Sequence, residues 1–156
     1  ENDAQQFAGQ IKSIARILPT GQTAIGNALV FALSELNTNP YRGLRRVIDL
    51  SGDGRSNDGV LLKQARTFVL QNDVTINGLA ILNEVADLKQ YFRDQLIGGP
   101  GAFVLAARDY SDFARAIRDK LAREIGSTPV VGTTNSSATI NAQAEETRRF
   151  DSVSVR

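Results

Sequence analysis

The sequence has 156 residues, of which 42% are hydrophobic and 22% charged, and these values are typical of one ordinary globular domain. The net charge of +1 supplies no positive field for nucleic acid, and no run approaches the roughly 18 consecutive apolar residues of a membrane helix. Cysteine and histidine are absent, which excludes disulfides, thiolate zinc sites and Ser-His-Asp triads. Any metal must therefore be held by oxygen ligands, which suit Mg²⁺, Mn²⁺ or Ca²⁺.

Predicted helices and strands alternate along the chain. Apolar residues at helical spacing predict helices over residues 3–18, 23–36, 59–72 and 87–97, and from Asp109 or Ser111 to about Ile125. Short apolar runs that end at turn residues predict strands over residues 45–51, 74–82 and 102–106. This order predicts an α/β fold with a doubly wound parallel sheet, covered by helices on both faces.

The composition changes beyond Gly126 to Ser, Thr, Asn, Gly and Ala. We expect residues 1–125 to form the α/β domain and residues 126–156 to be a polar tail or linker, with short strands over 138–141 and 150–155. Because the sequence contains no methionine, we also expect Glu1 to be an internal position of a longer protein.

Polar side chains gather after the predicted strand 45–51. In open α/β sheets ligands bind at the carboxyl ends of the strands, which places Asp53 at the functional edge. The segment 49–59 holds three carboxylates and two hydroxyls, and an ordinary polar turn would explain them as well. An EF-hand is excluded because the twelfth position of that loop is Val60 instead of Glu. A phosphate loop is not supported, since no glycine-rich run ends in Lys-Ser or Lys-Thr.

Two further segments carry polar or glycine-rich signals. Thr23 precedes a helix, and its simplest role is to cap that helix through its hydroxyl. The run Gly98-Gly99-Pro100-Gly101 is either a tight turn, which we favour, or a flexible lid.

These segments, taken in order, resemble the later part of a von Willebrand factor type A (VWA) domain. That family is a Rossmann-like doubly wound sheet with a metal-ion-dependent adhesion site (MIDAS) on its upper edge. Its metal is bound by an Asp-x-Ser-x-Ser loop after the first strand, a threonine in a later loop and an aspartate after the fourth strand. Thr23 within residues 21–29 looks like that threonine, and Asp53 within residues 47–54 looks like that aspartate.

Within this superfamily the chain is most similar to an uncharacterised bacterial group of VWA-like proteins. The similarity covers roughly residues 1–125 and rests on four segments in the same order, at residues 21–26, 46–55, 76–83 and 97–103. The resemblance implies export to the periplasm or the outside of a bacterium.

The chain departs from the VWA pattern in one large respect. No Asp-x-Ser-x-Ser strand precedes Thr23, so the resemblance implies the carboxyl-terminal part of a VWA-like domain, incomplete at its amino-terminal side. The alternative that Asp49-x-Ser51-x-Asp53 is this motif puts the loops in the wrong order. A parallel sheet without its central strand exposes an apolar edge. We expect an amino-terminal fragment, a second copy of the chain or the tail strands to cover it.

The resemblance implies a binding module and no enzyme. A divalent cation, Mg²⁺ or else Mn²⁺ or Ca²⁺, would be held by Thr23 and Asp53, with Ser51 as a weaker candidate and Asp53 acting directly or through water. The cation would complete its coordination with a carboxylate from a protein partner. Two alternatives stay open: a structural or assembly domain without metal, and a Mg²⁺-dependent phosphoryl-transfer or hydrolytic enzyme that uses Asp53 with Asp49 and Arg55.

Overall fold

The computed structural model describes residues 2–15 and 21–126. The chain divides into two units, residues 1–123 and 124–156, and the description that follows concerns the first unit and the end of its last helix. The polar tail with its two expected strands lies outside the described residues.

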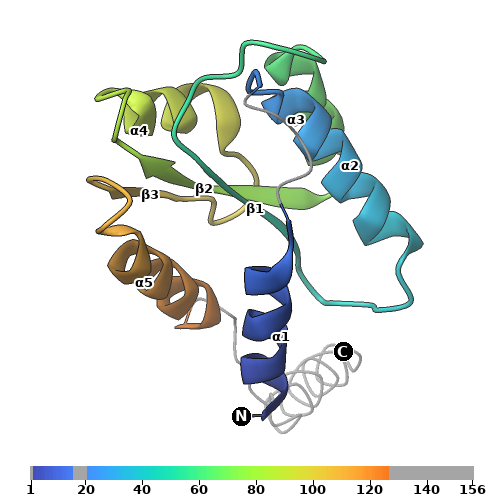
Figure 1. The fold of residues 1–156 in the computed structure, drawn as a ribbon. Coiled ribbons are helices and arrows are strands. Elements are labelled where there is room, and N and C mark those ends of the chain that lie inside the picture. The colour runs from blue at the N-terminus through green and yellow to red at the C-terminus, as the bar shows by residue number, and fades with distance from the viewer. Residues whose placement is uncertain (1, 16–20, 127–156) are drawn as a thin grey trace, which may run out of the picture. The chain divides into compact units, whose positions relative to one another are not determined.

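Three parallel strands form the sheet at the centre of this unit, in the order β1-β2-β3 (Figure 1). These are β1 (Arg46–Gly52), β2 (Val74–Ile81) and β3 (Val104–Ala107). Their bounds lie within two residues of the predicted strands. The α/β fold is therefore confirmed, and it is consistent with a Rossmann-like arrangement.

Helices cover both faces of the sheet (Figure 1). On one face lie α2 (Ile25–Thr38), α3 (Leu62–Gln71) and α4 (Leu88–Tyr91), and on the other lies α5 (Phe113–Gly126). Because side chains alternate along a strand, β2 supplies both cores. Its even-numbered side chains pack with the first group of helices, and Leu79 and Ile81 pack with Ala116 of α5. Every residue of β2 is buried, as its near-continuous apolar run predicts.

β1 has a similar apolar run but lies at an edge. Among the described residues it pairs only with β2, from Arg46 opposite Val74 to Gly52 opposite Ala80. Ile48 is buried, whereas Val47 and Leu50 are half-buried. What covers the outer edge of β1 stays a prediction.

The first described helix is α1 (Asn2–Ser13), and all its residues are exposed. Its apolar positions include Phe7 and Ile11, which are 63% and 54% exposed. The predicted continuation of this helix reaches residues 16–20, which lie outside the described part. No helix in residues 2–15 or 21–126 has both the length and the hydrophobicity that a membrane crossing requires.

The predicted helix 87–97 has an irregular second half. α4 continues into a π-helical turn, η1 (Phe92–Leu96), and this turn buries Phe92 and Leu96 against the sheet. Residues 98–101, which follow η1, form the expected tight turn. Gly99 and Gly101 adopt φ angles of +93° and +71° there, which favour glycine.

Candidate functional site

The loop that follows β1, residues 53–61, lies at the carboxyl end of the sheet and is called the β1–α3 loop here. In an open α/β sheet this edge is where ligands bind. Hydrogen bonds and ion pairs join the β1–α3 loop to the segment before α2, to the region of α4 and to the loop after β3. It is thus the meeting point of the loops at this edge.

Thr23 is joined to the β1–α3 loop by two backbone-mediated hydrogen bonds. The Thr23 N–H donates to Oδ1 of Asn57 at 2.7 Å, and the Asn57 N–H donates to the Thr23 carbonyl at 3.0 Å. The Thr23 hydroxyl also faces the loop, since a Cβ added at Gly54 would lie 3.3 Å from its Oγ1. The structure therefore brings Thr23 next to the residue that follows Asp53.

The predicted capping role of Thr23 is wrong. α2 begins at Ile25, its N-cap position is Ala24, and no side chain caps the helix. The physical reason is that the backbone of Thr23 pairs with Asn57, which holds Thr23 away from the first turn of the helix.

The first turn of α2 packs unusually closely on the β1–α3 loop. A Cβ at Gly26 would overlap the carbonyl oxygen of Val60, so only glycine allows this approach. On the next residue, Oδ1 of Asn27 accepts a hydrogen bond of 2.8 Å from the Val60 N–H. These contacts fix the position of Thr23, which immediately precedes this turn.

Asp53 is half-buried, and the Tyr110 hydroxyl donates a hydrogen bond to its Oδ2. Tyr110 lies in the loop between β3 and α5 and is 58% exposed. Sequence reasoning missed this contact. The signal that could have found it is position, since Tyr110 follows a predicted parallel strand and the carboxyl ends of parallel strands share one edge.

Arg55 holds the β1–α3 loop against the α4 region. Its Nη2 donates to Oδ2 of Asp87 at 2.5 Å, and its guanidinium carbon lies 5.1 Å from the centre of the Tyr91 ring. The Tyr91 hydroxyl accepts a 3.3 Å hydrogen bond from the Ser56 N–H. The hydrogen bond with Arg55 lowers the pKa of Asp87, and the same bond raises the pKa of Arg55.

The other members of the segment 49–53 lie differently. Ser51 is exposed and precedes Asp53 by two residues on the same chain segment. Asp49 forms an ion pair with Lys120 of α5, a lysine whose side chain is fully buried. Asp49 therefore belongs to the packing between the sheet and α5.

The possible ligands at this edge are oxygen atoms, which hard cations prefer, but they are too few to fill a coordination shell. It offers the Asp53 carboxylate and the hydroxyls of Thr23 and Ser51, and oxygen donors of this type bind Mg²⁺ or Mn²⁺. The part of the chain that the structure describes holds no group of three or more acidic, histidine or cysteine residues around one point. A cation here would need water or groups from another molecule to complete its ligands.

Residues 1–129 match the family model described as Protein of unknown function (DUF1194). The chain belongs to the DUF1194 family. No curated protein and no solved structure matches the chain. The matched range includes all three residues of the candidate site that the structure joins to the β1–α3 loop or places in it: Thr23, Asp53 and Tyr110.

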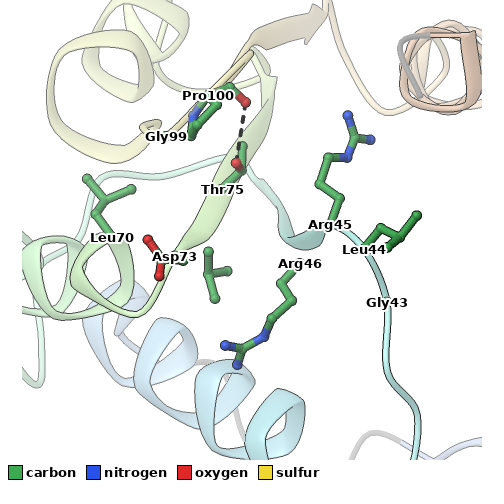
Figure 2. Close-up of a pocket in the computed structure, with 10 residues that line it drawn as sticks. Gly43, Leu44, Arg45, Arg46, Leu70, Asp73, Thr75, Gly99 and Pro100 are labelled. Carbon is green, nitrogen blue, oxygen red and sulfur yellow. Dashed lines mark hydrogen bonds between the residues drawn. The ribbon is translucent and has the colours of Figure 1, made fainter. Parts of the chain in front are cut away.

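A cavity of about 510 Å³ lies at the opposite, amino-terminal edge of the DUF1194 sheet (Figure 2). Arg46 lines this cavity, and Figure 2 shows its guanidinium end directed toward α2, where Nη2 donates to Oδ1 of Asn37 at 2.5 Å. Nη1 of Arg46 donates to the carbonyl of Asn72 at the end of α3. Cations are favourable at helix carboxyl ends, so Arg46 anchors the start of β1 to two helices.

Proposed function

We propose that this chain is a protein-binding module whose carboxyl-edge site holds a divalent cation, organised like the later part of a VWA-like domain. The observation that carries the proposal is the junction of two loops. Thr23 and Asn57 are 34 positions apart in the sequence and are joined by two hydrogen bonds. This junction puts a threonine hydroxyl beside the loop that carries Asp53.

The chemistry of the site supports a cation that is open to a partner. Asp53 would supply one negative charge, directly or through water, and the Thr23 hydroxyl would supply a neutral oxygen. A cation held by so few charged groups keeps most of its positive charge. It would therefore attract a carboxylate from a protein partner, which would complete the ligand set.

A structural or assembly role without metal is the second candidate. The observation that favours it is the hydrogen bond from the Tyr110 hydroxyl to Oδ2 of Asp53, which gives this carboxylate a partner within the chain itself. The enzymatic alternative is not proposed, because Asp49 pairs with Lys120 and Arg55 pairs with Asp87, so both supporting groups have other partners.

A calorimetric titration of the chain with Mg²⁺ and Mn²⁺ separates the two candidates. We expect binding to the unaltered chain and its loss in Asp53→Asn, because that change removes the charged ligand and keeps the shape of the side chain. Asp3→Asn is the control, since Asp3 lies on the exposed α1 and its loss changes the net charge equally. Absence of binding at millimolar metal would support the role without metal. Equal binding by Asp53→Asn would place the cation away from Asp53 and overturn the proposed site.

A further inference from the structure

We propose that the Tyr110 hydroxyl competes with the cation for Asp53, so that Tyr110 sets the metal affinity of the site. This inference rests on the proposed function. It concerns a residue of the β3–α5 loop that neither the motif around Thr23 nor the motif around Asp53 includes.

The hydrogen bond itself creates the competition. The Tyr110 hydroxyl donates to Oδ2 of Asp53, so its proton points at the carboxylate. A cation on the same carboxylate would face the positive end of the O–H dipole, and the two are mutually unfavourable. Hydrogen bonds to an ionised carboxylate are also stronger than neutral ones, so the cost of displacing this donor is appreciable. The cation must therefore shift the hydroxyl or bind to a carboxylate that is already partly satisfied.

Hydrogen bonds hold the backbone of the loop that carries Tyr110. Oδ1 of Asp109 accepts hydrogen bonds from the Ser111 hydroxyl at 2.5 Å and from the Asp112 N–H at 3.0 Å. The Asp112 carboxylate then accepts from the Arg108 N–H at 3.0 Å and from Arg115 at 2.6 and 2.8 Å. These bonds close the backbone on both sides of Tyr110.

Exposure makes Tyr110 suitable for this role. With 58% of its surface exposed, the ring contributes little to the core, and its hydroxyl can turn to water when Asp53 takes a cation. The opposite arrangement is that the phenol oxygen itself becomes a metal ligand. The two arrangements predict opposite signs for the loss of the hydroxyl.

The test compares Mn²⁺ affinity, measured by calorimetry, among the unaltered chain, Tyr110→Phe and Tyr41→Phe. Tyr41 is 82% exposed and lines a cavity at the amino-terminal edge, so its variant is the matched control. We expect Tyr110→Phe to bind about tenfold more tightly, which corresponds to the loss of one competing hydrogen bond of ordinary net strength. Tyr41→Phe should bind like the unaltered chain. Thermal unfolding of each variant checks that the fold is kept.

The Mn²⁺ affinities test the competition by Tyr110 separately from the cation site itself. Tighter binding by Tyr110→Phe, or binding by this variant alone, supports the competition. Equal or weaker binding by Tyr110→Phe overturns it and leaves the cation site standing. Failure of both the unaltered chain and Tyr110→Phe to bind Mn²⁺ overturns the proposed function and this inference together.

Discussion

The Asp112 carboxylate accepts several hydrogen bonds in the loop that follows β3. Its side chain is buried, and it accepts hydrogen bonds from the Arg108 backbone and from the guanidinium of Arg115. The hydrogen bonds from Arg115, followed by that from Arg108, hold the pKa of Asp112 well below its usual range. The ionised form is thus favoured in the folded state, and this form orders the loop that carries Tyr110.

We predict that Asp112→Asn lowers the free energy of unfolding at neutral pH, and that this cost shrinks in acid. A carboxyl whose pKa is lowered on folding adds stability above its unfolded pKa and loses it as the pH falls through the folded pKa. The difference in free energy of unfolding between the unaltered chain and Asp112→Asn should therefore narrow below about pH 4. Urea unfolding from pH 7 to pH 3 measures it. Asp119→Asn is the control, because Asp119 pairs with the same Arg115 but is half exposed. A gap that stays constant with pH would contradict this role of the Asp112 charge.

Some residues of the candidate site could be predicted from the sequence, and others could not. Thr23 and Asp53 were found through the resemblance to a known motif, and the structure places their loops together. Asn57 and Tyr110 were missed, because a hydrogen bond between two loops depends on the order and register of the strands. The local sequence around these two residues reveals neither the order nor the register. Thr23 as a cap was wrong for the same reason, since a distant partner takes its backbone.

The element that positions the site is α2, through the first turn that it lays on the β1–α3 loop. Helical spacing predicted α2 and its apolar side well, and Leu29 and Leu33 are indeed fully buried. The need for Gly26 could not be predicted, because it comes from the carbonyl of Val60 on another segment. The π-helical turn η1 was missed likewise, since its side chains have the spacing of an ordinary helix.

We predict that Gly26→Ala destabilises the chain by about 1–3 kcal/mol, as overpacking of a close contact typically does. The added Cβ would overlap the Val60 carbonyl and push α2 off the loop. Gly9→Ala is the matched control, because a Cβ at Gly9 meets nothing within 4 Å and alanine favours a helix. Chemical unfolding followed by circular dichroism measures both variants. Equal stability of Gly26→Ala and Gly9→Ala would show that the contact is not tight.

For the whole molecule, the sheet separates two edges with different chemistry. The carboxyl edge gathers Asp53, Thr23 and Tyr110, whereas the amino edge holds Arg46 and a cavity of about 510 Å³. The alternation of helices and strands predicted the α/β class and the parallel sheet. It could not predict that β2 is central and β1 at the edge, because both have similar apolar runs and their neighbours are set by distant pairing.

The most direct test of the cation site is paramagnetic broadening of backbone amide signals by Mn²⁺ added in small amounts. We predict that signals from residues 21–24 and 51–57 disappear first. Signals from residues 43–46 and 99–101, at the opposite edge, should persist at the same Mn²⁺ concentration. Uniform weak broadening, or selective broadening around other exposed carboxylates such as Asp94, would contradict a cation site at Asp53.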